Sequence, residues 1–101
     1  MLQKGKRMNI LEKDVEKYLK TEVEKIGGLC LKWISPGNSG VPDRIVIYRG
    51  MVRLVEMKRP GGKLRMQQII THKKLRKAGV IVDVLYSIDD VDRFIFDLVA
   101  P

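Results

Sequence analysis

Two carboxylates and an ammonium group lie at the ends of two predicted strands in the middle of the chain. Asp43 directly precedes the apolar stretch 44–48, and the stretch 52–58 ends with Glu56 and Lys58. Side chains two apart in a strand share a face, so one apolar face ends in a carboxylate and then an ammonium group. Because buried charge is costly unless it is paired or bound to a metal, this strand end is either a solvated surface or a chemical site.

The turn between the two strands brings the carboxylates together. Arg49-Gly50 predicts a hairpin, in which the start of one strand lies beside the end of the next. Adjacent carboxylates repel unless a cation separates them, and hard oxygen ligands without imidazole favour Mg²⁺ or Mn²⁺. With Lys58 beside them, Asp43 and Glu56 predict metal-assisted hydrolysis of a phosphodiester bond. The alternative from these residues alone is an ordinary surface pair after a common Pro-Asp turn.

Length and composition limit the class of protein. The 101 residues predict one domain with one modest core. The net charge of +8 favours a polyanionic partner, most often nucleic acid. A single cysteine excludes an intrachain disulfide, and a single histidine excludes a two-histidine metal site. Since no apolar run reaches the roughly 18 residues of a membrane span and the start lacks a secretory signal, we expect a cytoplasmic protein without a membrane partner.

The hydrophobic pattern predicts an α/β domain in which a mixed sheet is flanked by helices. Residues 1–8 are expected to form a basic tail, and Asn9 is expected to cap the first helix. Ser87 and Asp90 make a similar start for a last helix to about residue 99. The predicted order is αβββαβα, with the remaining helix over 64–78 and strands over 29–34, 44–48, 52–58 and 80–86.

Three segments of the chain resemble the VRR-NUC family, the virus-type replication-repair nucleases of the PD-(D/E)xK superfamily. They are GVPDR at 40–44, VEMKRPGGKLRMQQ at 55–68 and KAGVIVDVLYS at 77–87. The resemblance covers about residues 9–90. It implies the restriction-endonuclease-like core, αβββαβ with a further helix, as a single domain over 9–101. It also implies a stand-alone protein of the phage or bacterial type, acting in the cytoplasm of a bacterium or of a phage's bacterial host.

The resemblance also assigns roles to residues around the hairpin. Asp43 and Glu56 would be ligands of Mg²⁺ or Mn²⁺, with the backbone carbonyl of Met57 as a further ligand. Lys58 would assist the attacking water and stabilise the transition state. These residues together would make the chain a hydrolase, a metal-dependent endodeoxyribonuclease.

Helix residues complete the set that the resemblance implies. Gln68, rather than its neighbour Gln67, would lie near the metal from the second helix. The acid expected on the first helix is Glu12 or Glu16, which are four apart and share a face. His72 is expected on the surface of the second helix, with a phosphate contact one turn from Gln68 as the alternative. The loops 35–40 and 59–62 are expected to be flexible. The residues expected to contact DNA are Arg44, Arg59, Lys63, Arg65, Lys73, Lys74 and Lys77.

The substrate implied by the resemblance is branched DNA, such as a four-way (Holliday) junction. A junction is cut at two related phosphates and the chain holds one site, so we expect a homodimer. Its interface is predicted on the last helix, which carries more apolar residues than one stripe needs, or on the adjacent sheet edge. The alternatives are a flap or single-strand nuclease, a catalytically silent DNA-binding domain of the same fold, and a basic interaction module with an accidental motif.

Overall fold

The computed structural model describes residues 11–101, so the predicted tail 1–8 and the predicted Asn9 cap lie outside the described residues. The first described helix begins at Glu12, and the Asp14 carboxylate accepts a hydrogen bond from the Leu11 backbone N–H at 3.0 Å. The elements, in chain order, are α2 (Glu12–Lys25), β1 (Leu29–Lys32), β2 (Arg44–Tyr48), β3 (Met51–Met57), α3 (Met66–Lys77), β4 (Ile81–Leu85) and α4 (Ile88–Val99). This order confirms the predicted αβββαβα fold.

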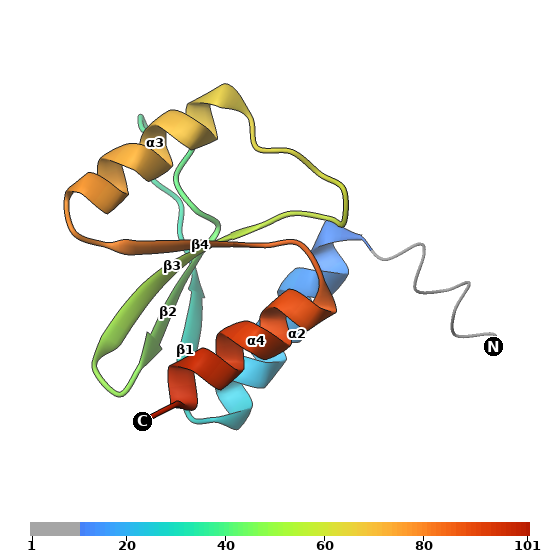
Figure 1. Ribbon diagram of the computed structural model, residues 1–101. Helices are drawn as coiled ribbons and strands as arrows, with labels where there is room; N and C mark the ends of the chain where they lie inside the picture. The colour runs from blue at the N-terminus through green and yellow to red at the C-terminus, as the bar shows by residue number, and fades with distance from the viewer. Residues whose placement is uncertain (1–10) are drawn as a thin grey trace.

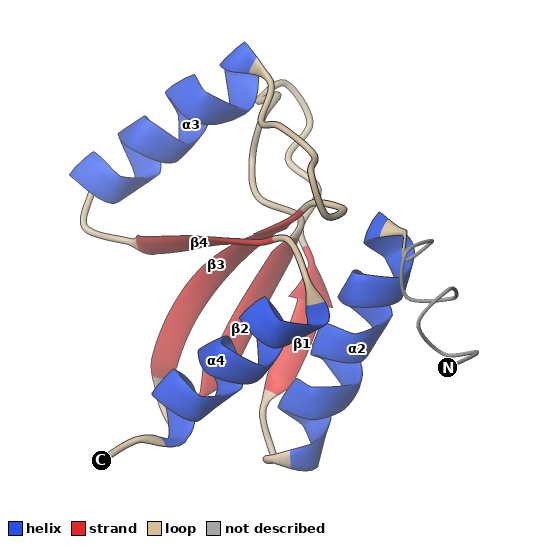
Figure 2. Cartoon of the chain, turned by 45° about the vertical axis from the view of Figure 1, so that its right-hand side comes forward, coloured by secondary structure: helices blue, strands red, loops and turns tan. Residues whose placement is uncertain are grey.

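The four strands form one mixed sheet in the order β1-β2-β3-β4. β1 and β3 both pair antiparallel with β2, and β4 pairs parallel with β3. A parallel neighbour needs a crossover connection, which α3 provides. Figures 1 and 2 show three layers, with α3 on one side of the sheet and α2 and α4 together on the other. In residues 11–101, the helices are all too short or too polar to cross a bilayer.

The layer between the sheet and the α2–α4 pair is an apolar core. Val15, Leu19 and Val23 recur at helical spacing along α2 and are completely buried. Phe94 and Leu98 do the same from α4. The sheet residues that meet them are Cys30, Val46, Val55, Met57 and Leu85. This layer therefore supplies most of the hydrophobic stabilisation of the fold.

The layer beneath α3 is different, because the helix buries polar side chains. The buried residues of α3 are Gln68 and His72. Its outer surface carries the exposed apolar residues Met66, Ile69 and Ile70. The expectation that His72 lies on the helix surface is therefore wrong: its side chain is fully buried against the sheet. The cause is that the helix turns its polar residues toward Glu56 rather than toward solvent.

The predicted hairpin is confirmed, and its geometry sets the position of the two carboxylates. Arg49 and Gly50 both have positive φ, 48° and 81°, as a type I′ turn requires. The register pairs Arg44 with Val55. The next position along each strand therefore places Asp43 opposite Glu56.

The loop 35–42 is held against α3, contrary to the expectation of a flexible loop. Thr71 donates its hydroxyl to the Ser39 carbonyl at 2.8 Å. Gly40 has φ of +85°, and a Cβ there would lie only 2.4 Å from the Gln67 carbonyl oxygen. Only glycine fits such a close approach, so the loop and the helix form one wall beside the site.

Candidate active site

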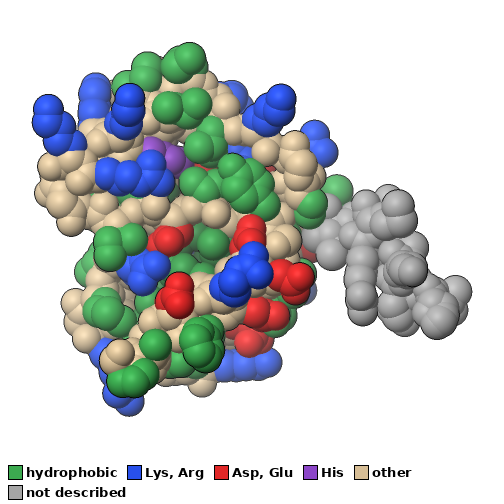
Figure 3. Space-filling view, in the orientation of Figure 1, with side chains coloured by type: hydrophobic (Ala, Val, Ile, Leu, Met, Phe, Trp, Pro, Cys, Tyr) green, Lys and Arg blue, Asp and Glu red, His purple; other side chains and the backbone are tan. Residues whose placement is uncertain are grey.

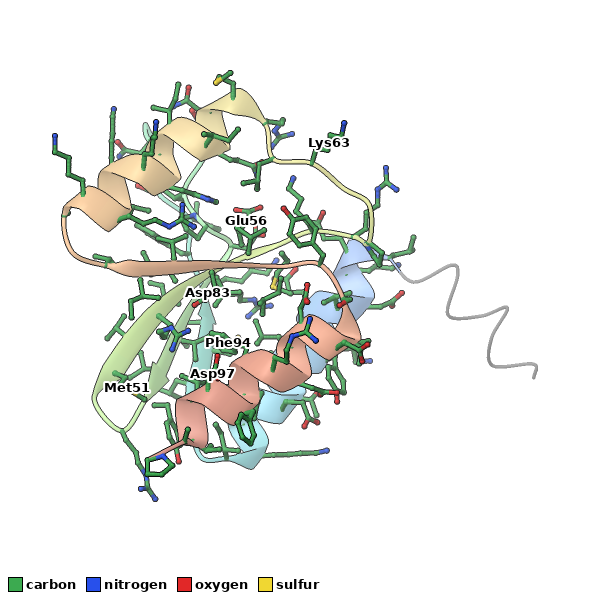
Figure 4. The ribbon with its side chains drawn as sticks, in the orientation of Figure 1. Met51, Glu56, Lys63, Asp83, Phe94 and Asp97 are labelled. Carbon is green, nitrogen blue, oxygen red and sulfur yellow. The ribbon has the colours of Figure 1, made fainter. Side chains whose placement is uncertain are left out.

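Asp43 and Glu56 lie side by side at the entrance of β2 and the end of β3. The Met57 backbone N–H donates to Asp43 Oδ2 at 2.8 Å, which fixes the Asp43 side chain across the end of the hairpin. Figure 4 shows Glu56 on the α3 side of the sheet, whereas Asp83 and Phe94 lie on the side of α4. The structure thus brings together the two carboxylates that the sequence predicts as a pair.

Glu56 is a buried acid in an unusual electrostatic setting. Its side chain is 2% exposed. Burial, as the largest cause, and the nearby carboxyl group of Asp43 together raise the pKa of Glu56 to about 8. Lys58 opposes these effects, and Glu12 adds to them. At neutral pH and without a cation, the pair of carboxylates therefore holds a proton.

Gln68 connects the start of α3 to Glu56. Its Nε2 donates to Glu56 Oε2 at 3.0 Å, and its Oε1 accepts from the Arg65 backbone N–H at 2.8 Å. The second bond satisfies one of the free donors at the start of the helix, so the same side chain both begins α3 and contacts the carboxylate. Gln67 is exposed and does not point into the site. Gln68 is thus the glutamine that the structure places beside the acidic pair.

His72 faces the other oxygen of the same carboxylate. Its Nε2 lies 3.5 Å from Glu56 Oε1, and its side chain is 1% exposed. Burial and the charge of Arg76 lower the pKa of His72, so the imidazole is neutral at pH 7. Within residues 11–101, Glu56 Oε1 and both His72 nitrogens lack a hydrogen-bond partner.

Lys58 follows directly after β3, on the Glu56 side of the strand end. Its backbone N–H donates to the Leu85 carbonyl at 3.0 Å, which extends the ladder to β4 by one residue. Its side chain is partly exposed. Its ammonium group is close enough to lower the pKa of Glu56 against the larger effect of burial. Lys58 is therefore a partly exposed cation near the carboxylates.

The two acids predicted on the first helix have different positions. Glu12 lies near enough to Glu56 for its charge to raise the pKa of that carboxyl group. Glu16 instead pairs with Arg44, whose Nε donates to Glu16 Oε2 at 2.7 Å, and Arg44 also donates to the Cys30 carbonyl at 3.1 Å. Of the two candidates, Glu12 is therefore the one whose charge acts on Glu56.

The ion pair between Arg44 and Glu16 disagrees with the prediction that Arg44 contacts DNA. The Arg44 side chain is buried between β2 and α2, on the face of the sheet opposite Glu56, and is held by Glu16. Alternation along the strand explains this, because Arg44 points away from the face that Asp43 shares with Ile45. Arg44 therefore has a structural position rather than one that can meet DNA.

The remaining basic residues gather in the α3 layer. Residues 57–82 contain eight Lys or Arg and no Asp or Glu, so the whole excess of +8 lies in this segment. Figure 3 shows basic side chains over α3 and acidic ones around α4. The exposed members are Arg59, Lys63, Arg65, Lys73, Lys74, Arg76 and Lys77. Six of these are the predicted DNA contacts other than Arg44, and they lie on α3 or in the loop before it.

The donor set fits a hard divalent cation that keeps part of its hydration shell. In the described part of the chain, no three His, Cys, Asp or Glu side chains are arranged to hold a metal ion. Mg²⁺ commonly binds through one or two carboxylates, with water and substrate phosphate completing the shell. Asp43 and Glu56 supply two carboxylates, and the raised pKa of Glu56 marks a site that a cation would relieve of repulsion.

Comparison with known proteins identifies the family of the chain. The sequence profile of the VRR-NUC domain matches residues 7–89. The chain belongs to the VRR-NUC family. It is also 46% identical over 81 residues to "Putative nuclease p44" of Acyrthosiphon pisum secondary endosymbiont phage 1, a match that covers 79% of this chain and 87% of the phage protein. The resemblance seen in the sequence is thereby confirmed.

A solved structure supports the same assignment for the fold. It is described as a VRR_NUC domain and superposes with a TM-score of 0.78 at 39% sequence identity. The match covers 84% of this chain and 94% of that structure. The mixed sheet and its flanking helices are therefore the VRR-NUC arrangement.

The sequence predicted His72 one turn from Gln68 but on the helix surface, and it did not predict the burial of His72 against Glu56 in this VRR-NUC site. One signal was present, because His72 follows Gln68 by four residues and therefore shares its helix face. The apolar residues of α3 gave no guidance about which face is buried, because Met66, Ile69 and Ile70 are all exposed.

Proposed function

We propose that this VRR-NUC domain is a metal-dependent endonuclease that hydrolyses phosphodiester bonds in DNA with Mg²⁺ or Mn²⁺. The main support is the acidic pair of half-buried Asp43 and buried Glu56, which lies beneath a layer whose charged side chains are all basic. A phosphate drawn to that layer meets Lys58 and then the two carboxylates. The family, and a phage relative named as a nuclease, agree with this assignment.

Each residue has a separate part in the proposed reaction. Asp43 and Glu56 would hold the cation, with the Met57 carbonyl as a further ligand, and the cation would supply Lewis-acid activation of water. Lys58 would donate a hydrogen bond to a phosphate oxygen and stabilise the charge that develops there. Gln68 would keep the Glu56 carboxylate in place. Overall, a water oxygen bonds to phosphorus, one sugar–phosphate bond breaks, and the leaving oxygen takes a proton.

Glu12 is the first-helix residue that we assign to this site. Its charge acts on Glu56, whereas the carboxylate of Glu16 is occupied by Arg44. At the start of α2, Glu12 would orient a hydrated cation or the attacking water through a bridging water molecule. Exchange of each acid for glutamine separates the two roles: Glu12→Gln should lower the cleavage rate, whereas Glu16→Gln should lower the stability of the fold.

Branched DNA, in particular a four-way junction, is the substrate that we propose. The basic residues are spread along α3 and the loop before it, so the surface extends well beyond the acidic pair. A surface of this extent suits a bulky, backbone-rich substrate rather than a single nucleotide. One chain carries one such pair, so paired cuts in a junction require two copies related by a two-fold axis.

For the homodimer we propose an interface on the face of the sheet that carries the exposed Leu29 and Leu31 of β1. Leu29 and Leu31 are exposed on β1, and the register places Leu29 beside Ile47, which in turn faces the exposed Val52. On α4, Phe96 is 71% exposed, but that helix carries four aspartates and one arginine. Two copies of α4 would therefore bring like charges together, which favours the sheet face over the last helix.

Sedimentation of two charge variants tests the position of the interface. Leu31→Asp should give a monomer at concentrations where the wild type is a dimer, whereas Phe96→Asp should leave the dimer intact. The opposite result would move the interface to α4. A wild type that stays monomeric both alone and on a junction would favour a flap or a single strand as the substrate.

Cleavage of labelled DNA tests the activity itself. Four-way, flap and linear duplex DNA are incubated with Mn²⁺ or with a chelator, and we expect Mn²⁺-dependent cuts at paired positions in the junction. Asp43→Asn and Glu56→Gln should both abolish cleavage. Asp97→Asn is the matched control, because it removes an exposed acid from α4 and should cut normally. Tight binding without cleavage by the wild type would instead indicate a catalytically silent DNA-binding domain.

A further inference from the structure

The carboxylate of Glu56 faces two polar side chains that lie one turn apart on α3. Gln68 Nε2 donates to Oε2 at 3.0 Å, and His72 Nε2 lies 3.5 Å from Oε1. Residues four apart share a helix face, so one face of α3 presents a nitrogen to each oxygen of the carboxylate. Of these two nitrogens, only Gln68 Nε2 forms a hydrogen bond with the carboxylate.

Packing alone does not explain a histidine at this position. The side chain is almost fully buried, and within the described residues neither of its ring nitrogens has a hydrogen-bond partner. A buried polar group without a partner lowers stability, and an apolar side chain of similar size would avoid that loss. The third unpartnered atom of this kind is Glu56 Oε1, which is the oxygen that His72 faces.

His72 Nε2 and Glu56 Oε1 have the donor and acceptor capacity to form a hydrogen bond with each other. A neutral imidazole has one N–H donor, and a carboxylate oxygen has two lone pairs. An N–H at Nε2 can therefore donate to Oε1 and leave a lone pair free for a cation. A contact of 3.5 Å needs to shorten by only a few tenths of an ångström to reach the usual range of about 2.7–3.2 Å.

We propose that His72 is a positioning residue that donates from Nε2 to Oε1 of ionised Glu56 and, together with Gln68, aims this carboxylate at a divalent cation shared with Asp43. The inference rests on the proposed metal-dependent function. His72 itself does not touch the cation or the DNA. Residues that orient metal ligands in this way typically change metal affinity by about 10- to 100-fold when they are removed.

Substitution of His72 separates positioning from packing. His72→Leu should weaken Mn²⁺ binding about 10-fold in titration calorimetry, while its unfolding midpoint in chelator stays at or above that of the wild type. His72→Gln, which places an amide N–H near the position of Nε2, should restore most of the affinity. Val82→Ala is the matched control, because it removes buried volume under α3 and should lower the midpoint without changing Mn²⁺ affinity.

Nuclear magnetic resonance of the sole histidine of the chain gives a readout that needs no variant to fold. With ¹⁵N-labelled histidine, we expect the Nε2–H tautomer, and we expect its Nε2 signal to move when Mg²⁺ is added and in Glu56→Gln. An Nδ1–H tautomer, or His72→Leu with wild-type Mn²⁺ affinity, would overturn the positioning role alone. A wild type that binds neither Mg²⁺ nor Mn²⁺ would overturn the proposed function, and this inference with it.

Discussion

The two faces of the sheet bury different kinds of side chain. On the α2–α4 face, the buried side chains form an apolar cluster, apart from the paired Arg44. On the α3 face, the buried set includes Glu56, Gln68 and His72. The surface above the second face carries basic residues and exposed apolar ones, whereas the helices of the first face hold most of the acids.

The difference indicates that, in this domain of 101 residues, one face of the sheet stabilises the fold and the other carries the candidate site. A small domain has room for one good core, and here the α2–α4 face provides it. The α3 face then accepts a buried acid with a raised pKa, which costs stability but suits a cation site. We infer that mutations on the two faces act on different properties, stability on one and DNA cleavage on the other. The predictions below test that division.

The largest expected effect is the salt dependence of DNA binding. If about six phosphates contact the α3 layer, the slope of log K against log salt should be near −5, and affinity should fall about 10³-fold between roughly 50 and 200 mM salt. Lys73→Gln or Lys77→Gln should make the slope less steep by about 1. Lys17→Gln on α2 should leave it unchanged. A slope near zero would contradict DNA binding through these phosphate contacts. An equal change of slope in Lys17→Gln would show that the contacts are not confined to the α3 layer.

Loss of core volume should give the largest change in stability. Leu19 is completely buried in α2, so Leu19→Ala should lower the free energy of unfolding by about 2–5 kcal/mol. Ile70→Ala, on the outer surface of α3, should lower it by less than about 1 kcal/mol. Urea unfolding measures both values. Similar losses at the two positions would show that α3 also carries a core.

Removal of the site ammonium group should change rate rather than stability. Lys58→Ala should reduce the single-turnover cleavage rate about 10²-fold or more, because one charge contact to the transition state is lost. Its unfolding midpoint should stay near that of the wild type, since the side chain is partly exposed. Lys20→Ala, which removes an exposed lysine from α2, is the control. Cleavage by Lys58→Ala at the wild-type rate would make Lys58 a surface charge.

How well each region can be predicted from the sequence depends on whether the side chains that it buries are apolar or polar. The hairpin could be predicted because Arg49-Gly50 specifies the turn, and side-chain alternation then places Asp43 beside Glu56. The apolar spacing of Val15, Leu19 and Val23 likewise marks the face of α2 that is buried. In both cases the local pattern and the tertiary packing agree.

The other residues depend on tertiary contacts that local patterns do not encode. Glu12 and Glu16 lie on one helix face, and only the partner of Glu16, Arg44, shows which acid is free to act at the site. His72 was expected on the surface because α3 has no apolar stripe that marks its inner face. The hydrophobic pattern therefore fails at the one helix whose buried face is polar.

The most gradual effect that we predict is the pH dependence of stability in the presence of a chelator. The folded protein holds the Glu56 proton up to a pKa of about 8, whereas the unfolded chain loses it near the ordinary pKa of 4.5. Because the native state binds the extra proton between these values, stability should fall as pH rises from 4.5 to about 8, by at most about 1.4 kcal/mol per pH unit, and should level off above the folded pKa. Asp43, Glu12, Lys58 and His72 face this carboxyl group, and all four remain in Glu56→Gln. The variant should therefore show a flatter profile, measured by thermal unfolding in matched buffers. Equal slopes for the two proteins would mean that Glu56 is already ionised in the fold, and that the α3 face tolerates a buried charge without a cation.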